Sequence, residues 1–231
     1  MKIIEAHELT KTYTIDARPI RVLDQVSLSI THGEFVVIEG SSGSGKSTLL
    51  SLLSGLDNPT SGRLCVDGVD ITHKTEDELA PMRNCTIGFV FQSFHLAPSL
   101  SALENVMFPA ELARDPQAHE KAEALLHRVG LQARMNNFPN QLSGGEKQRV
   151  AICRALVNNP KIVFADEPTG NLDTKNGQAI LDLLLDLHKE RQTTLVLVTH
   201  SPEISALAER VITLQDGHIV ESLSPSRIPT A

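Results

Sequence analysis

Residues 34–47 of the chain read Glu34-Phe35-Val36-Val37-Ile38-Glu39-Gly40-Ser41-Ser42-Gly43-Ser44-Gly45-Lys46-Ser47. The first six are apolar on both faces, as is typical of a buried parallel strand. After the glycine-rich loop, residues 46–54 have helical spacing with their leucines on one side, and Gly55 ends the helix. A strand, a glycine loop and a helix in this order predict an α/β sheet that binds its ligand at the carboxyl end of the strand.

The loop itself has the pattern Gly-x-x-x-x-Gly-Lys-Ser, which in this context is a phosphate-binding loop, or P-loop. Its glycines let backbone N–H groups curl around phosphate oxygens, and the helix N-terminus adds its dipole. A merely flexible Gly/Ser loop would not require the flanking strand and helix. We predict that ATP is bound with Mg²⁺ by Gly40, Ser41, Ser42, Gly43, Ser44, Gly45, Lys46, Ser47 and Thr48.

The rest of the chain is expected to form one domain, residues 1–231, divided by a helical insertion. Strands are expected at 62–67, 87–91, 162–165, 193–199 and 210–214, and helices at 103–113, 118–129, 146–158 and 176–190. The α/β core would comprise residues 1–92 and 161–220, and the helical subdomain residues 93–160. The Ser- and Pro-rich tail, 221–231, is expected to fray.

Composition limits the functional classes. The 231 residues carry a formal net charge of −7, which argues against a nucleic-acid surface as the main partner. The three cysteines are far apart, lack the spacing of a zinc site and are expected to be packing residues. Residues 1–5 lack the layout of a signal peptide, and no apolar run reaches the length of a membrane span. We therefore expect a cytosolic chain that reaches a membrane only through a partner.

Two further strands are expected to end in titratable residues at the same edge of the sheet. Ile162 to Ala165 is followed by Asp166 and Glu167, so that Asp166 would face Mg²⁺ and Glu167 would polarise an attacking water. A solvated turn before Pro168 would explain the two carboxylates only if they stood alone. His200 ends the other strand, where it would contact the γ-phosphate and orient Glu167.

A second glycine motif, Leu142-Ser143-Gly144-Gly145-Glu146, opens an expected helix. Ser143 and Glu146 have the spacing of a capping box, which accounts for the local structure. Consecutive glycines weaken a helix but allow a ligand to approach its backbone closely. The motif therefore indicates a second anion site at a helix start.

This motif, followed by the strand that ends in Asp166-Glu167, resembles the signature of ABC-type ATPases. Gln92 matches the family's Q-loop glutamine, Asp173 the D-loop, His200 the switch histidine and Tyr13 the aromatic residue that stacks on adenine. The matches run from about residue 3 to residue 220. The resemblance implies a P-loop NTPase fold of the ABC type, with a RecA-like core and an inserted helical subdomain.

The resemblance also implies the roles of the site residues. Catalysis is expected of Glu167, His200, Lys46 and Gln92, and Mg²⁺ binding of Ser47, Gln92 and Asp166. Ser143, Gly144, Gly145 and Glu146 would contact the ATP held by a second copy, so that two copies sandwich two ATP molecules head to tail. Glu146 replaces a frequent Gln, and Gly170-Asn171 replaces the common Ser-Ala; neither change removes a catalytic group.

Three stretches, 89–96, 103–106 and 165–173, resemble one subgroup of the family, which contains LolD-like, MacB-like and YbbA-like ATPases with FtsE nearby. This implies an integral membrane permease of the FtsX/MacB type as partner and a location at the cytoplasmic face of the cytoplasmic (inner) membrane. The partner would dock beside the Q-loop, at Phe94, His95, Leu96 and Pro98. The same residues equally suit packing of the insertion against the core.

Three functions fit this resemblance. The first is an ATPase that drives a membrane partner in export, lipoprotein release or force transmission. The second is an FtsE-like signalling ATPase that regulates a cell-wall hydrolase. The third is an ABC ATPase acting on nucleic acid, but such relatives carry coiled coils or two cassettes, which this acidic chain lacks.

Overall fold

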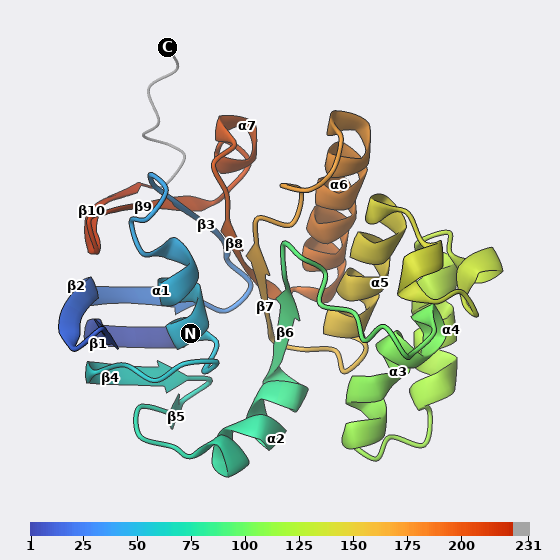
Figure 1. Cartoon of the computed structure of the whole chain (residues 1–231), viewed down its shortest axis with the longest axis horizontal. Coiled ribbons are helices and arrows are strands. Elements are labelled where there is room, and N and C mark those ends of the chain that lie inside the picture. Colours follow the sequence, from blue (N-terminus) through green and yellow to red (C-terminus); the bar gives the residue numbers. More distant parts are fainter. Residues whose placement is uncertain (224–231) are drawn as a thin grey trace. The chain divides into compact units, whose positions relative to one another are not determined.

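The computed structural model describes residues 1–223, which form two compact units (Figure 1). Unit 1 contains Met1–Leu79 and the chain from Thr194, and unit 2 contains Ala80–Thr193. Within the tail that was expected to fray, residues 221–223 belong to strand β10, and residues 224–231 lie outside the described part. Among the described residues, no helix has both the length and the apolar character needed to cross a bilayer.

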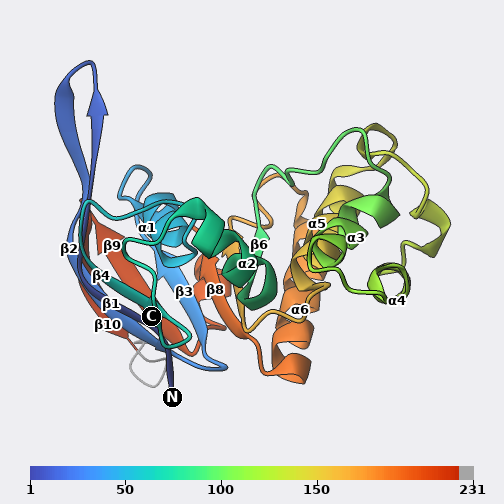
Figure 2. The ribbon, with the colours of Figure 1, turned by 90° about the horizontal axis from the view of Figure 1, so that it is seen from below.

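One sheet of unit 1 is antiparallel, with the strand order β2-β1-β4-β5. The strands are β1 (Lys2–Ile15), β2 (Arg18–Thr31), β4 (Ser61–Val66) and β5 (Val69–Asp70). Figure 2 shows the long β1–β2 hairpin projecting beyond the rest of this sheet. Asp16 and Ala17 make its two-residue turn with φ of 50° and 60°, as a primed turn requires.

The second group of strands in unit 1 follows the order β10-β9-β3-β8. Strand β3 (Phe35–Glu39) lies parallel to both β8 (Thr194–Val198) and β9 (Arg210–Gln215), and β10 (His218–Leu223) is antiparallel to β9. Helix α1 (Lys46–Leu53) follows the glycine loop, and its four leucines are fully buried. The strand–loop–helix unit predicted from residues 34–54 is therefore confirmed.

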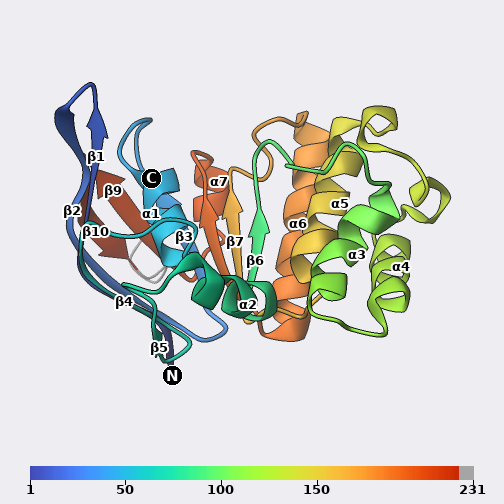
Figure 3. The ribbon, with the colours of Figure 1, turned by 60° about the horizontal axis from the view of Figure 1, so that its bottom comes forward.

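Unit 2 combines two parallel strands with a group of helices (Figure 3). Strand β6 (Ile87–Val90) pairs with β7 (Ile162–Asp166), Ile87 opposite Ile162. Between them, where the structure describes every residue, are α3 (Ala102–Leu112), α4 (Ala118–Arg128), α5 (Gly144–Leu156) and the 3₁₀ turns Gln132–Arg134 and Pro139–Gln141, with no strand. Helix α6 (Thr174–Arg191) follows β7. The segment between β6 and β7 is thus helical as expected, whereas the division into a core of residues 1–92 and 161–220 and a subdomain of 93–160 stays a prediction.

The helices of the insertion share one apolar core. Its members are mostly small or aliphatic, which allows α3, α4 and α5 to approach closely. The buried set comprises Ala102, Val106, Ala110, Ala118, Ala122, Leu125, Leu126, Leu131, Leu142, Val150, Cys153 and Val157. Cys153 is therefore a packing residue as predicted, but Cys85 is exposed and the same prediction was wrong for it.

Two helices lay outside the sequence expectations. Helix α2 (Glu76–Thr86) consists mostly of polar residues and contains Pro81. Its sequence therefore shows neither an apolar stripe with helical spacing nor a recognisable helix end. Helix α7 (Pro202–Ser205) is a single turn after β8, capped by the Ser201 hydroxyl. Strand β10 was likewise not predicted, because its exposed polar residues give no apolar run.

Candidate nucleotide-binding site

The phosphate loop of unit 1 depends on glycine at its start and its end. Gly40 has φ of 148°, and a Cβ there would lie 2.1 Å from the main-chain oxygen of Leu214. Gly45 has φ of 102°, and its Cβ would lie 2.9 Å from both Leu23 Cδ2 and the Val22 oxygen. Because side chains are excluded at both positions, the backbone of the loop is free to curve tightly ahead of α1.

Polar groups at the loop are arranged as a phosphate group would need them. The side chain of Lys46 is buried, and its Nζ donates to the main-chain oxygens of Gly40 and Ser41 at 2.9 and 2.8 Å. Ser44 Oγ is buried without a hydrogen-bond partner among the described residues. No side chain caps α1 or α4, whereas the side chains of Ser101, Ser143, Asp173 and Ser201 cap α3, α5, α6 and α7. A buried cation, an unsatisfied hydroxyl and an uncapped helix start together fit an anion.

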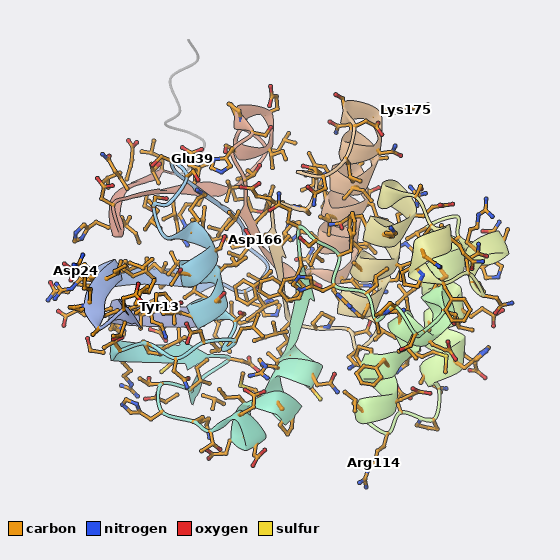
Figure 4. The ribbon with its side chains drawn as sticks, in the orientation of Figure 1. Tyr13, Asp24, Glu39, Arg114, Asp166 and Lys175 are labelled. Carbon is orange, nitrogen blue, oxygen red and sulfur yellow. The ribbon has the colours of Figure 1, made fainter. Side chains whose placement is uncertain are left out.

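Tyr13 lies on β1, in the same unit as the phosphate loop (Figure 4), and the residue is 37% exposed. Its hydroxyl donates to Asp57 Oδ2 at 2.8 Å, and the Thr48 side chain also hydrogen-bonds to it. Burial and the neighbouring Asp57 raise the pKa of Tyr13. Thr48 belongs to the first turn of α1, so the candidate base-stacking residue and the phosphate loop are connected directly.

His200 is exposed and follows β8 by two residues. Thr199 Oγ1 accepts a 3.1 Å hydrogen bond from the Ser201 N–H, which fixes the turn on which His200 stands. Strands β8 and β3 are parallel neighbours, so their carboxyl ends, which carry His200 and the phosphate loop, lie at one edge. The structure thus places three groups of predicted site residues in unit 1: the P-loop, Tyr13 and His200.

In unit 2, the two carboxylates stand at the carboxyl end of β7, where Asp166 is its last residue (Figure 4). Glu167 follows with φ of 43°, in the left-handed region that non-glycine residues rarely occupy. Such backbone strain costs about 1–3 kcal/mol and is concentrated at active sites, where it fixes a side chain in place. A strained backbone at the residue predicted to polarise water is consistent with that role.

Gln92 and Glu167 both lie beside Gly170. A Cβ at Gly170 would be 3.0 Å from Gln92 Nε2 and 3.3 Å from Glu167 Oε2. Asn171 Nδ2 donates to the main-chain oxygen of Gln92 at 2.9 Å. Gly170 and Asn171, two of the three positions at which this sequence departs from the family pattern, therefore both contact the Q-loop glutamine, and the departure itself was the available signal.

The signature motif forms the capping box that its spacing predicted. The N–H and hydroxyl of Ser143 both donate to Glu146 Oε2 at 2.8 Å, and the Glu146 N–H returns a 3.3 Å bond to Ser143 Oγ. The Ser143 N–H chiefly lowers the pKa of Glu146. A Cβ at Gly145 would lie 3.1 Å from Asn176 Oδ1, so this glycine accommodates α6, whereas a Cβ at Gly144 would have only ordinary contacts.

Asp173 caps α6. Its Oδ1 accepts from the Asn176 N–H at 3.0 Å and its Oδ2 from Asn176 Nδ2 at 2.6 Å, and these bonds lower the pKa of its carboxyl. Because Asn176 also packs against Gly145, Asp173 holds the D-loop next to the start of the signature helix.

The segment after Gln92 is held by Arg154 of α5, a residue that sequence reasoning missed. Its guanidinium donates to the main-chain oxygens of Phe94 and His95, both of which have positive φ. Leu96 packs on the insertion's core, while His95 stacks on Phe91 and is exposed, as is Pro98. This packing lies within the insertion and does not test whether Leu96 packs the insertion against the core; docking of a partner at the exposed His95 and Pro98 stays a prediction.

The oxygen ligands that could hold Mg²⁺ are few. Among the described residues there is no cluster of three or more His, Cys, Asp or Glu side chains suited to a metal. Mg²⁺ is commonly bound by one or two protein oxygens together with substrate phosphates. Ser47 of unit 1 is exposed and Asp166 ends β7 in unit 2, and each offers an oxygen of the kind that Mg²⁺ prefers.

Comparison with known proteins identifies the class. The ABC transporter family model matches residues 23–170. The macrolide export ATP-binding/permease protein MacB of Rhodospirillum rubrum is 50% identical over 95% of this chain and 34% of its own length. The lipoprotein-releasing ATP-binding protein LolD 2 of Chlorobaculum tepidum is 46% identical over 94% of this chain and 91% of its own. The chain spans about a third of the MacB relatives it matches.

Solved structures agree. The dimeric ATP-binding cassette MJ0796, described in a post-hydrolysis state with ADP and Pi, matches with a TM-score of 0.90 and 42% identity over 96% of this chain and 98% of its own. This protein therefore belongs to the ABC transporter family. It has the ATPase domain of that family, and its resemblance to LolD- and MacB-like cassettes is confirmed.

Proposed function

We propose that two copies of this chain bind two ATP molecules head to tail and use their hydrolysis to move an integral membrane permease of the FtsX/MacB type. The observation that carries the proposal is the presence of two glycine-containing helix starts in one chain. Gly45 precedes the uncapped α1, and Ser143 and Gly144 open α5 with Ser143 exposed. A dimer gives each of these sites a phosphate to bind.

Within this proposal, each predicted residue has a distinct task. Lys46 and the loop backbone bind the β- and γ-phosphates, Tyr13 stacks on adenine, and Ser47, Gln92 and Asp166 bind Mg²⁺. Glu167 accepts a proton from the attacking water, and His200 contacts the γ-phosphate and orients Glu167. Ser143, Gly144 and Gly145 of one copy bind the γ-phosphate of the other, Glu146 holds Ser143 at the start of α5, and Asp173 lies at the dimer interface.

The experiment is affinity purification of the tagged chain from solubilised membranes. We expect a polytopic membrane subunit to co-purify, and the protein to lie at the cytoplasmic face of the inner membrane through it. Recovery of ribosomes or DNA without a membrane protein would overturn the proposal. A partner that activates a cell-wall hydrolase, with no exported cargo, would instead favour FtsE-like signalling.

The oligomer is tested separately, on the purified chain. Size-exclusion chromatography with light scattering is expected to show a dimer in the presence of ATP when hydrolysis is blocked, and less dimer without nucleotide. Substituting Ser143→Arg, which places a bulky cation at the exposed start of α5, should prevent dimerisation while each copy still binds ATP. Nucleotide-dependent dimers of this variant would rule out the head-to-tail arrangement.

A further inference from the structure

A network of polar contacts surrounds Tyr13 that the proposed roles leave unexplained. Asp57, four residues beyond the end of α1, accepts the hydrogen bond from the Tyr13 hydroxyl on Oδ2 at 2.8 Å. Its other oxygen, Oδ1, accepts from Lys11 Nζ at 2.6 Å. The Asn58 N–H also donates to Oδ1, at 2.8 Å. Asp57 therefore holds the far end of the Tyr13 side chain while being held itself.

Lys11 completes the arrangement. Its Nζ donates to the main-chain oxygen of Asn58 at 2.7 Å and lies 4.8 Å from the centre of the Tyr13 ring, within range of a cation–π contact. The side chain of Lys11 is only 12% exposed and that of Asp57 is 31% exposed. Because the ammonium is tied to Asp57, Asn58 and the ring at once, neither the cation nor the ring moves independently.

The loop that carries Asp57 is attached to the phosphate-binding helix at one end and to β1 at the other. The Asp57 N–H donates to the Ser51 oxygen of α1 at 3.2 Å. The Thr60 N–H donates to the Thr10 oxygen at 2.8 Å, and Thr60 Oγ1 accepts from the Thr12 N–H at 3.0 Å. The distance from the phosphate loop to the Tyr13 ring is therefore set by this loop.

We propose that Asp57 and Lys11 are positioning residues for the nucleotide base, which hold the Tyr13 ring in one orientation at a fixed distance from the phosphate loop. The inference rests on the proposed function, which assigns adenine stacking to Tyr13. An aromatic ring on an exposed hairpin would otherwise occupy several rotamers, and ordering it would weaken ATP binding. With the ring already ordered, adenine binds a preformed surface.

The protonation states of Asp57 and Tyr13 favour the hydrogen bond between them. Burial acts to raise the pKa of Asp57, but hydrogen bonds from Lys11 and Tyr13 outweigh it and hold the pKa below its usual range. Asp57 is thus an ionised acceptor at neutral pH. Burial and the Asp57 carboxylate raise the pKa of Tyr13, so its phenol remains a donor. The contact between the two is therefore present throughout the physiological range.

The test uses the fact that Tyr13 is the sole tyrosine and that the chain has no tryptophan, so its fluorescence reports this ring alone. Binding of ATP and of inorganic tripolyphosphate is measured for wild type, Asp57→Ala, Lys11→Met, Tyr13→Phe and Tyr13→Ala. We expect Asp57→Ala to weaken the affinity for ATP about twofold to tenfold and to leave the affinity for tripolyphosphate unchanged, because tripolyphosphate has no base. Tyrosine anisotropy should fall in the same variant.

Asp70→Ala is the matched control. Asp70 also pairs with a cation and a hydroxyl, accepting from Arg63 Nε at 2.7 Å and from Thr72 Oγ1 at 2.6 Å, but it does not contact Tyr13. This variant should leave the affinities for ATP and tripolyphosphate and the tyrosine anisotropy unchanged. In a Tyr13→Ala background, Asp57→Ala should have no further effect on ATP affinity. Tyr13→Phe, which keeps the ring but removes the hydroxyl and with it the contacts to Asp57 and Thr48, is the second variant if Asp57→Ala does not fold.

The outcomes separate the inference from the proposed function. If Tyr13→Ala weakens the affinity for ATP but Asp57→Ala and Tyr13→Phe do not, the positioning role of Asp57 is wrong. The stacking role of Tyr13 then stands. Equal weakening of ATP and tripolyphosphate by Asp57→Ala would show that Asp57 acts on the phosphate loop and would also overturn the inference. If Tyr13→Ala leaves ATP affinity unchanged, the stacking assignment falls, and the positioning role falls with it.

Discussion

Asn171 Nδ2 donates a 2.9 Å hydrogen bond to the main-chain oxygen of Gln92, and this bond connects the segment after β7 to the segment after β6. The neighbouring Gly170 lies against the side chains of both Gln92 and Glu167. The residue expected to contact Mg²⁺ and the one expected to activate water are therefore positioned by the same turn. Small disturbances of this turn should affect hydrolysis more than binding.

Replacement of Asn171 tests that relationship. Asn171→Ala removes one hydrogen bond, worth about 0.5–1.5 kcal/mol, and loosens the Q-loop. We expect kcat for ATP hydrolysis to fall about twofold to tenfold while KM changes little, measured by phosphate release. Asn140→Ala, at another exposed asparagine of unit 2, is the control and should be silent. An equal fall in the control would show that the loss is not specific to the Gln92 contact.

Glu167→Gln removes the base while keeping the size of the side chain. General base catalysis typically contributes about 10²- to 10⁴-fold, so kcat should drop by that range while ATP still binds. The variant should then accumulate as an ATP-bound dimer in size-exclusion chromatography. Glu111→Gln, which removes the same charge from an exposed position on α3, should hydrolyse normally. Unchanged turnover in Glu167→Gln would refute the role of Glu167.

Lys46→Ala tests the phosphate loop. The buried ammonium donates two hydrogen bonds to loop oxygens at rest and is expected to donate to phosphate when ATP binds. Hydrogen bonds to charged groups are worth about 1.5–3 kcal/mol, so the Kd for ATP should rise at least about tenfold by calorimetry. Lys175→Ala, an exposed lysine at the start of α6, makes the same change in net charge and should bind normally.

The elements around the site were predictable because local chemistry specifies them. Residues 34–54 contain a buried strand, a glycine-rich loop and a helix with its leucines buried. Each of these three patterns can be recognised from its own residues, without knowledge of what it packs against. The Ser143–Glu146 capping box was equally readable from its spacing. Such features depend on residues only a few positions apart, and tertiary packing did not override them.

What the sequence did not reveal depends on distant partners. The hairpin of β1 and β2 is stabilised by antiparallel pairing along its two fourteen-residue strands, while the residues next to its turn are exposed and alternate polar with apolar side chains, so it has no continuous apolar run. The contact of Asp57 with Tyr13 spans 44 residues and that of Arg154 with Phe94 spans 60. No local pattern predicts such contacts, because either partner alone looks like an ordinary surface residue.

Two glycines of the phosphate loop give a matched test of stability. Gly43 and Gly45 both have positive φ, at 80° and 102°, but a Cβ meets nothing within 4 Å at Gly43 and lies 2.9 Å from Leu23 and Val22 atoms at Gly45. We expect Gly43→Ala to lower the free energy of unfolding by about 1 kcal/mol. Gly45→Ala should cost about 1–3 kcal/mol more, because overlap is added to strain. Denaturant titration without nucleotide measures both, and equal losses would refute the steric argument.

Cys153 gives a prediction about pH. Burial raises the pKa of its thiol to about 12, whereas an unfolded cysteine has a pKa of about 8.5. Above about pH 8.5 the unfolded chain therefore releases a proton that the native chain retains, and this group lowers stability by up to about 1.4 kcal/mol per pH unit. Well below that pH the thiol is protonated in both states, so it does not make the stability depend on pH. The stability difference between wild type and Cys153→Ala should accordingly be flat from pH 6 to 8 and shrink as pH rises further. A difference that stayed constant up to pH 10 would show that the thiol titrates alike in both states.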